Sequence, residues 1–527
     1  MIAAMCQLFS ALPVRGAEPA RQQETGPQKD DYFDIAEFRV LGNSVLPVKS
    51  IERAVYPFAG PHKNIDDVQS ARSALEAAYH DAGYATVFVD IPEQDVGQGI
   101  VRLRATEGRL DRIHVSGIRY FSARKILAEL PEVKAGAVPR MPALQTELAT
   151  VGAESADRAV TPVLKAGRTP GTVDLDLQVN DSLPLHGGLT LNDRYTPDTS
   201  KLRTTVDLSY GNLFQDFQSI AFEYQTAPEK LSDEKVLSLT YVAPLWFGHN
   251  LLAAYVIDTN SNVAAVGALS LLGDGQVYGL HLIHPFPVVG AFSQNINFGA
   301  DFKAFSQTVN VAGQPPDNTP IRYINWSLAY SLGEHTQKHD TSFGLTANFG
   351  IRGLANDPAE FDFKRFAAQA DYFYLRGSAE RRDSLPWLGL STDVRLSYQV
   401  ADGPLISNEQ FGLGGVDTVR GYIESIELGD NGVTVQVELR GPTWTFGGDP
   451  LRNHIGLYAF YDAGVTSILK PLPDQQSSFT LQSFGTGLRL IAFRAIDGTL
   501  DWAYPLRTVS TVTRGHSRVE FQLHFSF

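Results

Sequence analysis

The sequence predicts a β-dominated membrane protein: an antiparallel transmembrane β-barrel of about 16 strands, preceded by two small α+β modules. Strand-like segments of alternating apolar and polar residues recur roughly every 20 residues from Leu185 to the last residue. No apolar run reaches the ~18 residues of a transmembrane helix, whereas barrel strands are short and weak in hydropathy. Charged residues make up only 19% of the chain, while aromatic residues reach 10% and glycine 46 residues, a mixture typical of β-architecture.

The N-terminus is expected to target the chain to secretion. Residues 1–17 resemble a signal peptide, in which the apolar run Met1–Val14 leads to the cleavage motif Val14-Arg15-Gly16. No Lys or Arg precedes this run, which favours a translation start further upstream. Residues 18–31 form a polar linker. The single cysteine, Cys6, lies in the targeting segment, so we expect a mature chain without disulfides or cysteine-based metal sites.

Residues 32–108 predict a first module with the order β-α-α-β-β. The expected strands and helices are a strand at Ile35–Asn43, helices at Pro47–Tyr56 and Ile65–Asp81, and strands at Ala85–Ile91 and Gly99–Ala105. Within the second helix, apolar residues recur at helical spacing and Gly83 marks the stop. The pattern therefore predicts one small sheet covered by helices.

Residues 109–181 restart this plan, because Ile113–Gly117 matches Phe38–Gly42 at an offset of 75 positions (113 − 38). Helices are expected at Ser122–Leu130 and Pro142–Leu148, and a closing strand at Gly171–Val179. The repeat resembles POTRA domains, the periplasmic polypeptide-binding modules of outer-membrane translocators.

The POTRA resemblance implies a binding site for an unfolded client at exposed sheet edges. These edges are expected around Phe38, Val40, Ile113 and Val115, where the client would pair through its backbone. The alternative is that the modules act only as spacers.

Residues 184–527 are expected to form the barrel, whose strand number is even, as in bacterial outer-membrane proteins. The predicted strands are Leu185–Asn192, Leu202–Gly211, Phe217–Gln225, Lys235–Ala243, Asn250–Thr259, Gln276–His284, Ser293–Phe305, Pro320–Leu332, Asp340–Arg352, Phe363–Arg376, Leu388–Ala401, Val433–Arg440, Ile455–Val465, Phe479–Phe493, Gly498–Leu506 and Ser517–Phe527.

The last strand shows the alternation most clearly. Val519, Phe521, Leu523, Phe525 and Phe527 face one way and are expected to contact outer-membrane lipid, while charged and polar residues face a wet lumen. A terminal Phe on such a strand resembles the outer-membrane assembly signal, which implies insertion by the barrel-assembly machinery. A soluble β-sandwich, the alternative, would leave the run of about 16 strands unexplained.

The region 402–430 is a long glycine-rich loop ending in Val419, Arg420, Gly421 and Tyr422. The strands on either side place Arg395, Gln399, Gln436, Glu438 and Arg440 on their polar faces, so the loop is expected to fold into a water-filled lumen. The strand Leu457–Gly464 places Phe460, Asp462 and Gly464 on one face. Because a carboxylate facing lipid is unfavourable, we expect Asp462 to face the lumen and accept a bidentate pair from Arg420.

Val419–Tyr422, followed by Phe460–Gly464, resembles the signature of two-partner-secretion transporters, the haemolysin secretion/activation protein family ShlB/FhaC/HecB. Asn212–Asp216 and Gly485–Arg489 are similar to family turns and strands. The resemblance implies capture of an unfolded haemolysin- or adhesin-type exoprotein in the periplasm and its export through the barrel. Some members carry an N-terminal plug helix, for which Glu18–Asp31 is too short and polar, so loops alone are expected to plug the lumen.

Other function classes are disfavoured. The net charge of −14 and a pI near 5.3 argue against nucleic-acid binding. The sequence contains no P-loop, zinc-protease or serine-elbow motif, so we expect no enzyme activity, nucleotide, cofactor or metal. Arg381-Arg382-Asp383 is interpreted as a solvated charge cluster. A barrel-assembly factor of the same superfamily remains the alternative; it would share Arg420 and Asp462 but usually has more POTRA modules, whereas a porin would leave residues 32–180 unexplained.

Overall fold

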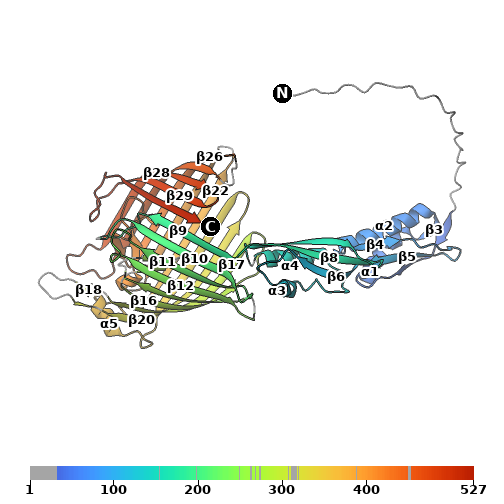
Figure 1. Ribbon diagram of the computed structural model, residues 1–527, viewed down its shortest axis with the longest axis horizontal. Coiled ribbons are helices and arrows are strands. Elements are labelled where there is room, and N and C mark those ends of the chain that lie inside the picture. Colours follow the sequence, from blue (N-terminus) through green and yellow to red (C-terminus); the bar gives the residue numbers. More distant parts are fainter. Residues whose placement is uncertain are drawn as a thin grey trace, which may run out of the picture. The chain divides into compact units, whose positions relative to one another are not determined.

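The structure is a computed structural model that describes residues 32–527 except 154, 198, 248–249, 261–263, 267–268, 272–273, 307, 310–316, 319, 387–388 and 449–452 (Figure 1). The signal peptide and linker expected at residues 1–31 lie outside this range. Contacts divide the described chain into two compact units. One holds residues 32–116, 127–150 and 160–178, and the other holds residues 117–126, 151–159 and 179–527.

The first module contains the predicted strands and helices and one small extra sheet. Its elements are β1 (Phe33–Ile35), β2 (Glu37–Leu41), α1 (Val48–Val55), the 3₁₀ helix η1 (Tyr56–Phe58), β3 (Gly60–Lys63), α2 (Ile65–Asp81), β4 (Val87–Asp90) and β5 (Ile100–Glu107). The sheet order is β2-β5-β4, and β1 pairs with β3 in a two-stranded sheet that the sequence did not predict. The helix α2 begins at Asn64, whose side chain accepts from Asp66 N and Asp67 N in a capping box.

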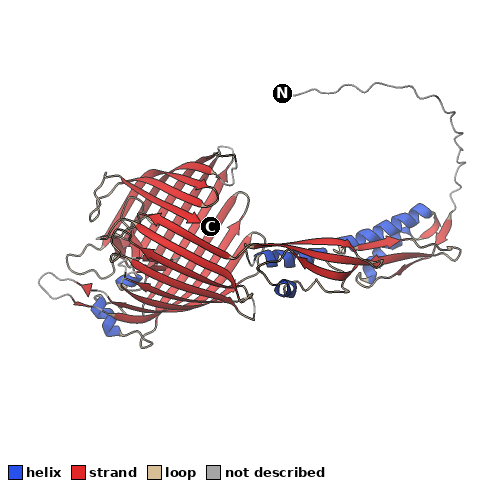
Figure 2. Ribbon diagram, viewed as in Figure 1, coloured by secondary structure: helices blue, strands red, loops and turns tan. Residues whose placement is uncertain are grey.

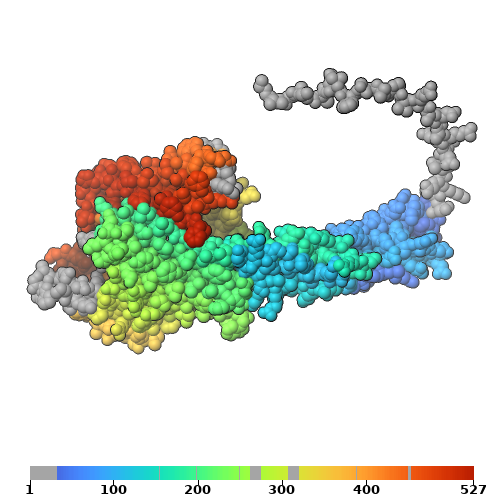
Figure 3. All heavy atoms as spheres, in the orientation of Figure 1, coloured from blue at the N-terminus to red at the C-terminus, as the bar shows by residue number. Residues whose placement is uncertain are grey.

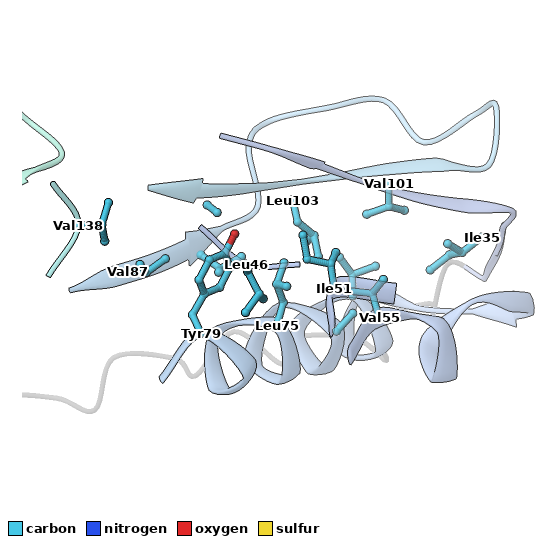
Figure 4. Packing of buried hydrophobic residues seen from close by; sticks show 14 residues of the cluster. Ile35, Leu46, Ile51, Val55, Leu75, Tyr79, Val87, Val101, Leu103 and Val138 are labelled. Carbon is cyan, nitrogen blue, oxygen red and sulfur yellow. The ribbon is translucent and has the colours of Figure 1, made fainter. Parts of the chain in front are cut away.

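The core of this module lies between the two helices and the sheet (Figure 4). Ile51 of α1 and Leu75 of α2 point toward Leu103 of β5, and all three are buried. Each such side chain stabilises the fold by about 1.5–3 kcal/mol through its removal from water. Tyr79 donates to Asn43 Oδ1 at 2.7 Å, and its burial raises the pKa of its hydroxyl, with a further contribution from the charge of Glu107.

The second module repeats this arrangement with β6 (Arg109–Ser116), α3 (Ala123–Ala128), α4 (Met141–Ala153), β7 (Arg158–Ala166) and β8 (Thr172–Asp181). Its sheet order is β6-β8-β7, in which β7 was not predicted. Among the described strands, β2 and β6 each pair with one neighbour only, β5 and β8 respectively. Both strands are therefore sheet edges.

The rest of the chain closes into an antiparallel barrel of 16 described strands, as predicted (Figures 1 and 2). The strands are β9 (Leu185–Asn192), β10 (Arg203–Leu213), β11 (Gln218–Thr226), β12 (Lys235–Pro244), β13 (Leu251–Thr259), β16 (Asp274–Pro285), β17 (Phe292–Ser306), β20 (Ile321–His335), β21 (His339–Gly350), β22 (Phe373–Leu385), β23 (Leu390–Ala401), β26 (Asn431–Thr445), β27 (His454–Ser467), β28 (Ser478–Ala492), β29 (Ile496–Pro505) and β30 (Arg518–Ser526). Strand β30 pairs with β9 and closes the barrel.

Short elements occupy several of the connections between barrel strands. They are β14 (Ala264–Val266), β15 (Leu269–Leu271), β18 (Thr308–Val309), β19 (Asp317–Asn318), α5 (Pro358–Lys364), the 3₁₀ helix η2 (Ser407–Glu409), β24 (Phe411–Leu413) and β25 (Glu427–Gly429). In the described part of the chain, no helix combines the length and apolar character needed to cross a membrane.

The barrel is apolar outside and polar inside. On β26, Val435 and Val437 are exposed on the outer face, whereas Gln436 and Glu438 are buried on the inner face. On β30, Val519 and Phe525 are exposed outside, and Glu520 is buried inside. The green part of the chain, which contains the first barrel strands, presents a continuous outer surface (Figure 3). This arrangement matches a bilayer, in which every backbone group must be paired within a closed sheet.

One predicted strand, Phe363–Arg376, is right only over its last four residues, which begin β22. The segment begins instead with α5, because Asp357 caps the helix by accepting from Ala359 N at 2.9 Å and Pro358 occupies its first position. The strand β22 starts only at Phe373, so Arg381, Arg382 and Asp383 lie on a barrel strand. The closely spaced aromatic residues Phe361, Phe363 and Phe366 of this helix and the turn after it resemble a strand in the sequence, and the helix-start signal at Asp357 and Pro358 was overlooked.

Candidate functional site

Residues 402–430 connect β23 to β26. We call residues 411–429 the hairpin, because β24 and β25 pair within it and its turn is closed by a bond from Gly415 N to Val419 O at 3.2 Å. The turn of the hairpin contacts inward-facing residues of β26 and β27, whose neighbours on the same strands, such as Leu439 and Leu457, are exposed outside. The hairpin therefore occupies the lumen.

Arg420 and Asp462 are bound to each other as a buried bidentate pair. Arg420 Nε and Nη2 donate to the two carboxylate oxygens of Asp462 at 2.7 and 2.9 Å, and the backbone N–H of Arg420 adds a bond at 3.1 Å. Arg420 is 2% exposed and Asp462 0%. Removing one partner of such a pair leaves a buried charge uncompensated, which typically costs about 3–5 kcal/mol.

Two further groups hold the guanidinium. Arg420 Nη1 donates to Glu438 Oε1 of β26 at 2.8 Å, and the guanidinium carbon lies 3.6 Å from the centre of the Phe460 ring. A desolvated cation–π contact of this kind contributes about 2 kcal/mol. Glu438 is also bonded by Arg440 of the same strand, so it has a cationic partner besides Arg420.

Gly421 and Tyr422 continue the contact with the wall. Gly421 has φ +87°, and a Cβ there would lie 3.0 Å from the Cβ of Ala503, so both the turn and the close approach require glycine. Its N–H donates to Glu520 of β30 at 2.9 Å. The Tyr422 hydroxyl donates to the carbonyl of Arg507 at 2.9 Å. Residues 419–422, which we call the tip of the hairpin, are thus bonded to several strands of the wall.

Small residues make room for the apolar part of the hairpin. Val419 is fully buried. A Cβ at Gly464 would lie 2.5 Å from Leu413 Cδ1 and 3.3 Å from Val419 Cγ2, so the absence of a side chain on β27 lets the hairpin reach the wall. Gly485 of β28 likewise makes room for the Phe460 ring, because a Cβ at position 485 would lie 2.3 Å from Phe460 Cζ.

The other side of the lumen is polar and partly open. A cavity of about 330 Å³ is lined by Thr205, Asp207 and Glu223 of β10 and β11, together with residues of β9, β30 and the hairpin. Arg194, in the connection from β9 to β10, bonds Glu424 of the hairpin at 3.0 Å. A polar cavity of this size has room for several water molecules.

The structure thus brings together Val419, Arg420, Gly421 and Tyr422 with Phe460, Asp462 and Gly464, while the other predicted residues lie elsewhere. Phe38 and Val40 lie on the edge strand β2, and Ile113 and Val115 on the edge strand β6. The sequence reasoning missed Glu438, Glu520 and Arg194 as partners of the hairpin. Alternation alone placed Glu438 in the lumen, but its contact with Arg420 depends on how the loop folds.

The residues at the site are arranged for holding a loop rather than binding a small group. In the described ranges, no cluster of three or more His, Cys, Asp or Glu side chains is arranged to hold a metal ion. The carboxylates at the site are bonded instead by arginine, tyrosine and backbone N–H groups.

Comparisons with known proteins agree with this architecture. The model for the POTRA domain of ShlB type matches residues 33–108, and the model for haemolysin secretion/activation protein ShlB/FhaC/HecB matches residues 171–490. The chain is 23% identical over 466 residues to the outer membrane transporter CdiB of Dickeya dadantii, covering 82% of this chain and 76% of that protein. It is 20% identical over 477 residues to the heme/hemopexin transporter protein HuxB of Haemophilus influenzae, covering 87% and 81%.

Solved structures share the fold. CdiB from Escherichia coli superposes with a TM-score of 0.63 at 17% identity, covering 96% of this chain and 93% of that one. BamA from Haemophilus ducreyi lacking POTRA domains 1–3 gives 0.57 at 13% identity, covering 94% and 100%. At these identities the likeness shows the fold alone. The family model, however, spans more than half of the chain. The chain therefore belongs to the haemolysin secretion/activation protein family ShlB/FhaC/HecB, and it is an outer-membrane transporter of a secreted partner protein with periplasmic N-terminal modules.

Proposed function

We propose that this protein captures one unfolded partner at the edges of its POTRA modules and threads it outward through the barrel lumen. The observation that carries the proposal is the hairpin, which occupies the lumen and is held there by the buried ion pair and hydrogen bonds as well as by an apolar cluster around Leu413, Val419 and Tyr422. Water can replace the polar contacts when the plug leaves, so this plug can leave and return more readily than a purely apolar one. Arg420 and Asp462 would set the resting position of the plug.

Capture is assigned to β2 and β6, around Phe38, Val40, Ile113 and Val115. An unpaired strand edge binds an extended chain through backbone hydrogen bonds and reads little of its sequence. This suits an unfolded client, which offers its backbone along its whole length. We expect an exoprotein of haemolysin or adhesin type, released outside the cell.

We further propose that transport proceeds without catalysis by this chain. The sequence has no nucleotide-binding motif, so the drive would come from folding of the client outside the cell. The outward apolar faces would contact outer-membrane lipid, and the last strand, ending in Phe527, would be recognised by the barrel-assembly machinery. We propose no nucleic-acid partner, because the chain is acidic, with a net charge of −14.

A comparison of culture supernatants and outer membranes, with and without the gene, tests the function. Loss of one large secreted protein, restored by the wild-type gene and with an unchanged membrane profile, is the expected result. Depletion of many outer-membrane barrels would instead identify an assembly factor and refute the single-partner proposal. A supernatant that does not change at all would also contradict it.

A further inference from the structure

Two buried carboxylates flank the hairpin on its two sides. Glu409 precedes it by two positions and Asp430 follows it directly. Glu409 is 2% exposed and Asp430 0%. Neither takes part in the contacts of Arg420, so they form a separate set of anchors at the base of the hairpin.

Glu409 is fixed to the barrel wall by three donors from three strands. Lys303 of β17 and Tyr323 of β20 both donate to its Oε1 at 2.6 Å. Tyr374 of β22 donates to Oε2 at 2.7 Å. A buried carboxylate with a cation and two hydroxyl donors is fully compensated, so moving it away would leave all of these groups unpaired.

Asp430 is fixed by an arginine from another connection. Arg365, which follows α5, donates to both carboxylate oxygens, with Nη2 2.7 Å from Oδ2. The same arginine also reaches the carbonyls of Leu405 and Leu469. The backbone N–H groups of Leu405 and Leu469 donate to the carboxylate at 2.8 and 2.6 Å. Asp430 thus joins three connections of the barrel at one point.

One glutamine links the two anchors to each other. The side-chain amide of Gln399, on β23 and fully buried, donates to the carbonyl of Glu409 at 3.0 Å and to that of Asp430 at 3.1 Å. Glu409 and Asp430, which form the base of the hairpin, are therefore each bonded to the wall and also held side by side.

The contacts at the tip and at the base of the hairpin differ in how many buried groups lose their partners when the contacts break. If the part of the hairpin around Arg420 withdraws, Glu438 keeps Arg440, and Asp501 of β29 keeps its bond from Tyr458. Asp462 then loses its three bonds from Arg420, Glu520 loses the Gly421 N–H, and Arg194, which lines the cavity, loses Glu424. If the base withdraws, the Glu409 and Asp430 sites are both broken. Release of the tip is therefore the less unfavourable motion.

We infer that the hairpin moves as one rigid element that pivots about a fixed base, and that Lys303, Arg365 and Gln399 are the positioning residues of that base. The internal pairing of β24 with β25 keeps the hairpin intact as it swings, and the pinned ends return it to the same place. The inference rests on the proposed transport, because it describes how the plug clears the lumen.

A disulfide across the hairpin tests the rigid motion. Leu413 and Glu427 are opposite each other in the β24–β25 pair, where Cα separations suit a disulfide. The natural sequence has only Cys6, in the expected signal peptide, so the Leu413→Cys/Glu427→Cys variant gives one clean cross-link. Secretion of the partner is compared with and without reductant in the same variant. Secretion within about twofold is expected; a loss of about tenfold on oxidation would mean that the hairpin strands must separate, and would overturn the inference.

The wild-type protein separates this outcome from a failure of the proposed function. If wild type and the reduced variant secrete the partner and the oxidised variant does not, only the rigid hairpin is refuted. If wild type secretes no partner, the transport proposal fails, and the inference, which describes a step of that transport, falls with it.

Single-channel conductance tests the base without any partner. Arg365→Gln should raise the conductance of the purified protein in planar bilayers, since Asp430 loses its cation and the base loosens. Arg365→Lys, which keeps the charge but not the paired donors, should fall between. Arg352→Gln, which breaks an exposed pair with Asp371 in the same connection, is the matched control and should match wild type. The two variants are first shown to be folded by their heat-modifiable migration in gel electrophoresis. Equal conductance of folded Arg365→Gln and folded Arg352→Gln would then refute the pinned base.

Discussion

Arg420 combines three kinds of contact in one buried side chain: a bidentate pair with Asp462, a second carboxylate at Glu438 and the face of Phe460. Lysine cannot reproduce this set, because its ammonium lacks the planar fork that matches a carboxylate. The identity of the residue, and not its charge alone, therefore fixes the tip of the hairpin.

The Arg420→Lys variant tests this point. We expect secretion of the partner to fall about tenfold or more and conductance to rise, because the tip loses its fixed resting position. Arg381→Lys alters an exposed pair with Asp383 on β22 and should leave both readouts unchanged. Normal secretion by Arg420→Lys, with the barrel inserted at the wild-type level, would argue against a role for the pair in transport.

The hairpin depends on the shape of the wall as much as on charge. Leu413 and Val419 reach β27 only because residue 464 is glycine. The fit belongs to two elements far apart in the sequence, one in the loop and one in the wall. A side chain on β27 should therefore displace the hairpin without touching the ion pair directly.

The Gly464→Ala variant is predicted to raise conductance. Its Cβ would lie 2.5 Å from Leu413 Cδ1 and 2.8 Å from Thr434 Cγ2, and such overpacking costs about 1–3 kcal/mol. Gly403→Ala is the control, since a Cβ there meets no atom within 4 Å. If the two variants conduct alike, the close packing of the hairpin on β27 does not keep the lumen closed.

Alternation along the strands was sufficient to predict nearly the whole barrel. It placed Val435 and Val437 outside and Gln436 and Glu438 inside, because one face of each strand meets lipid and the other meets water. It failed in the first part of Phe363–Arg376, residues 363–372, where a capped helix and the turn after it interrupt the pattern. The strands β3 and β7 were missed because their sequences carry no clear period.

The candidate site was predicted in part. Arg420 and Asp462 stand out in the sequence, since an arginine in a glycine-rich loop and a carboxylate on a lumenal face each need a partner. The anchors Glu409 and Asp430 give no such signal. Their partners, Lys303 and Arg365, are distant in the sequence and come together only when the barrel closes.

The whole chain joins two modules with exposed sheet edges to a barrel that is polar inside and apolar outside. A client bound by its backbone needs a path where its polar groups stay solvated, and the lumenal wall of β9–β13 offers one. Thr205 lines the cavity beside the hairpin, and Thr240 of β12 lines the adjoining one. Their neighbours Val206 and Leu239 are exposed on the outer face.

Site-specific photo-crosslinking during secretion tests passage through the lumen most directly. A photoreactive amino acid at position 205 or 240 should form adducts with the partner, whereas one at position 206 or 239 should not. Each lumenal site is thus matched by a lipid-facing neighbour on the same strand. Adducts at 206 or 239, or an absence of adducts at 205 and 240 while the partner is being secreted, would contradict transport through the barrel.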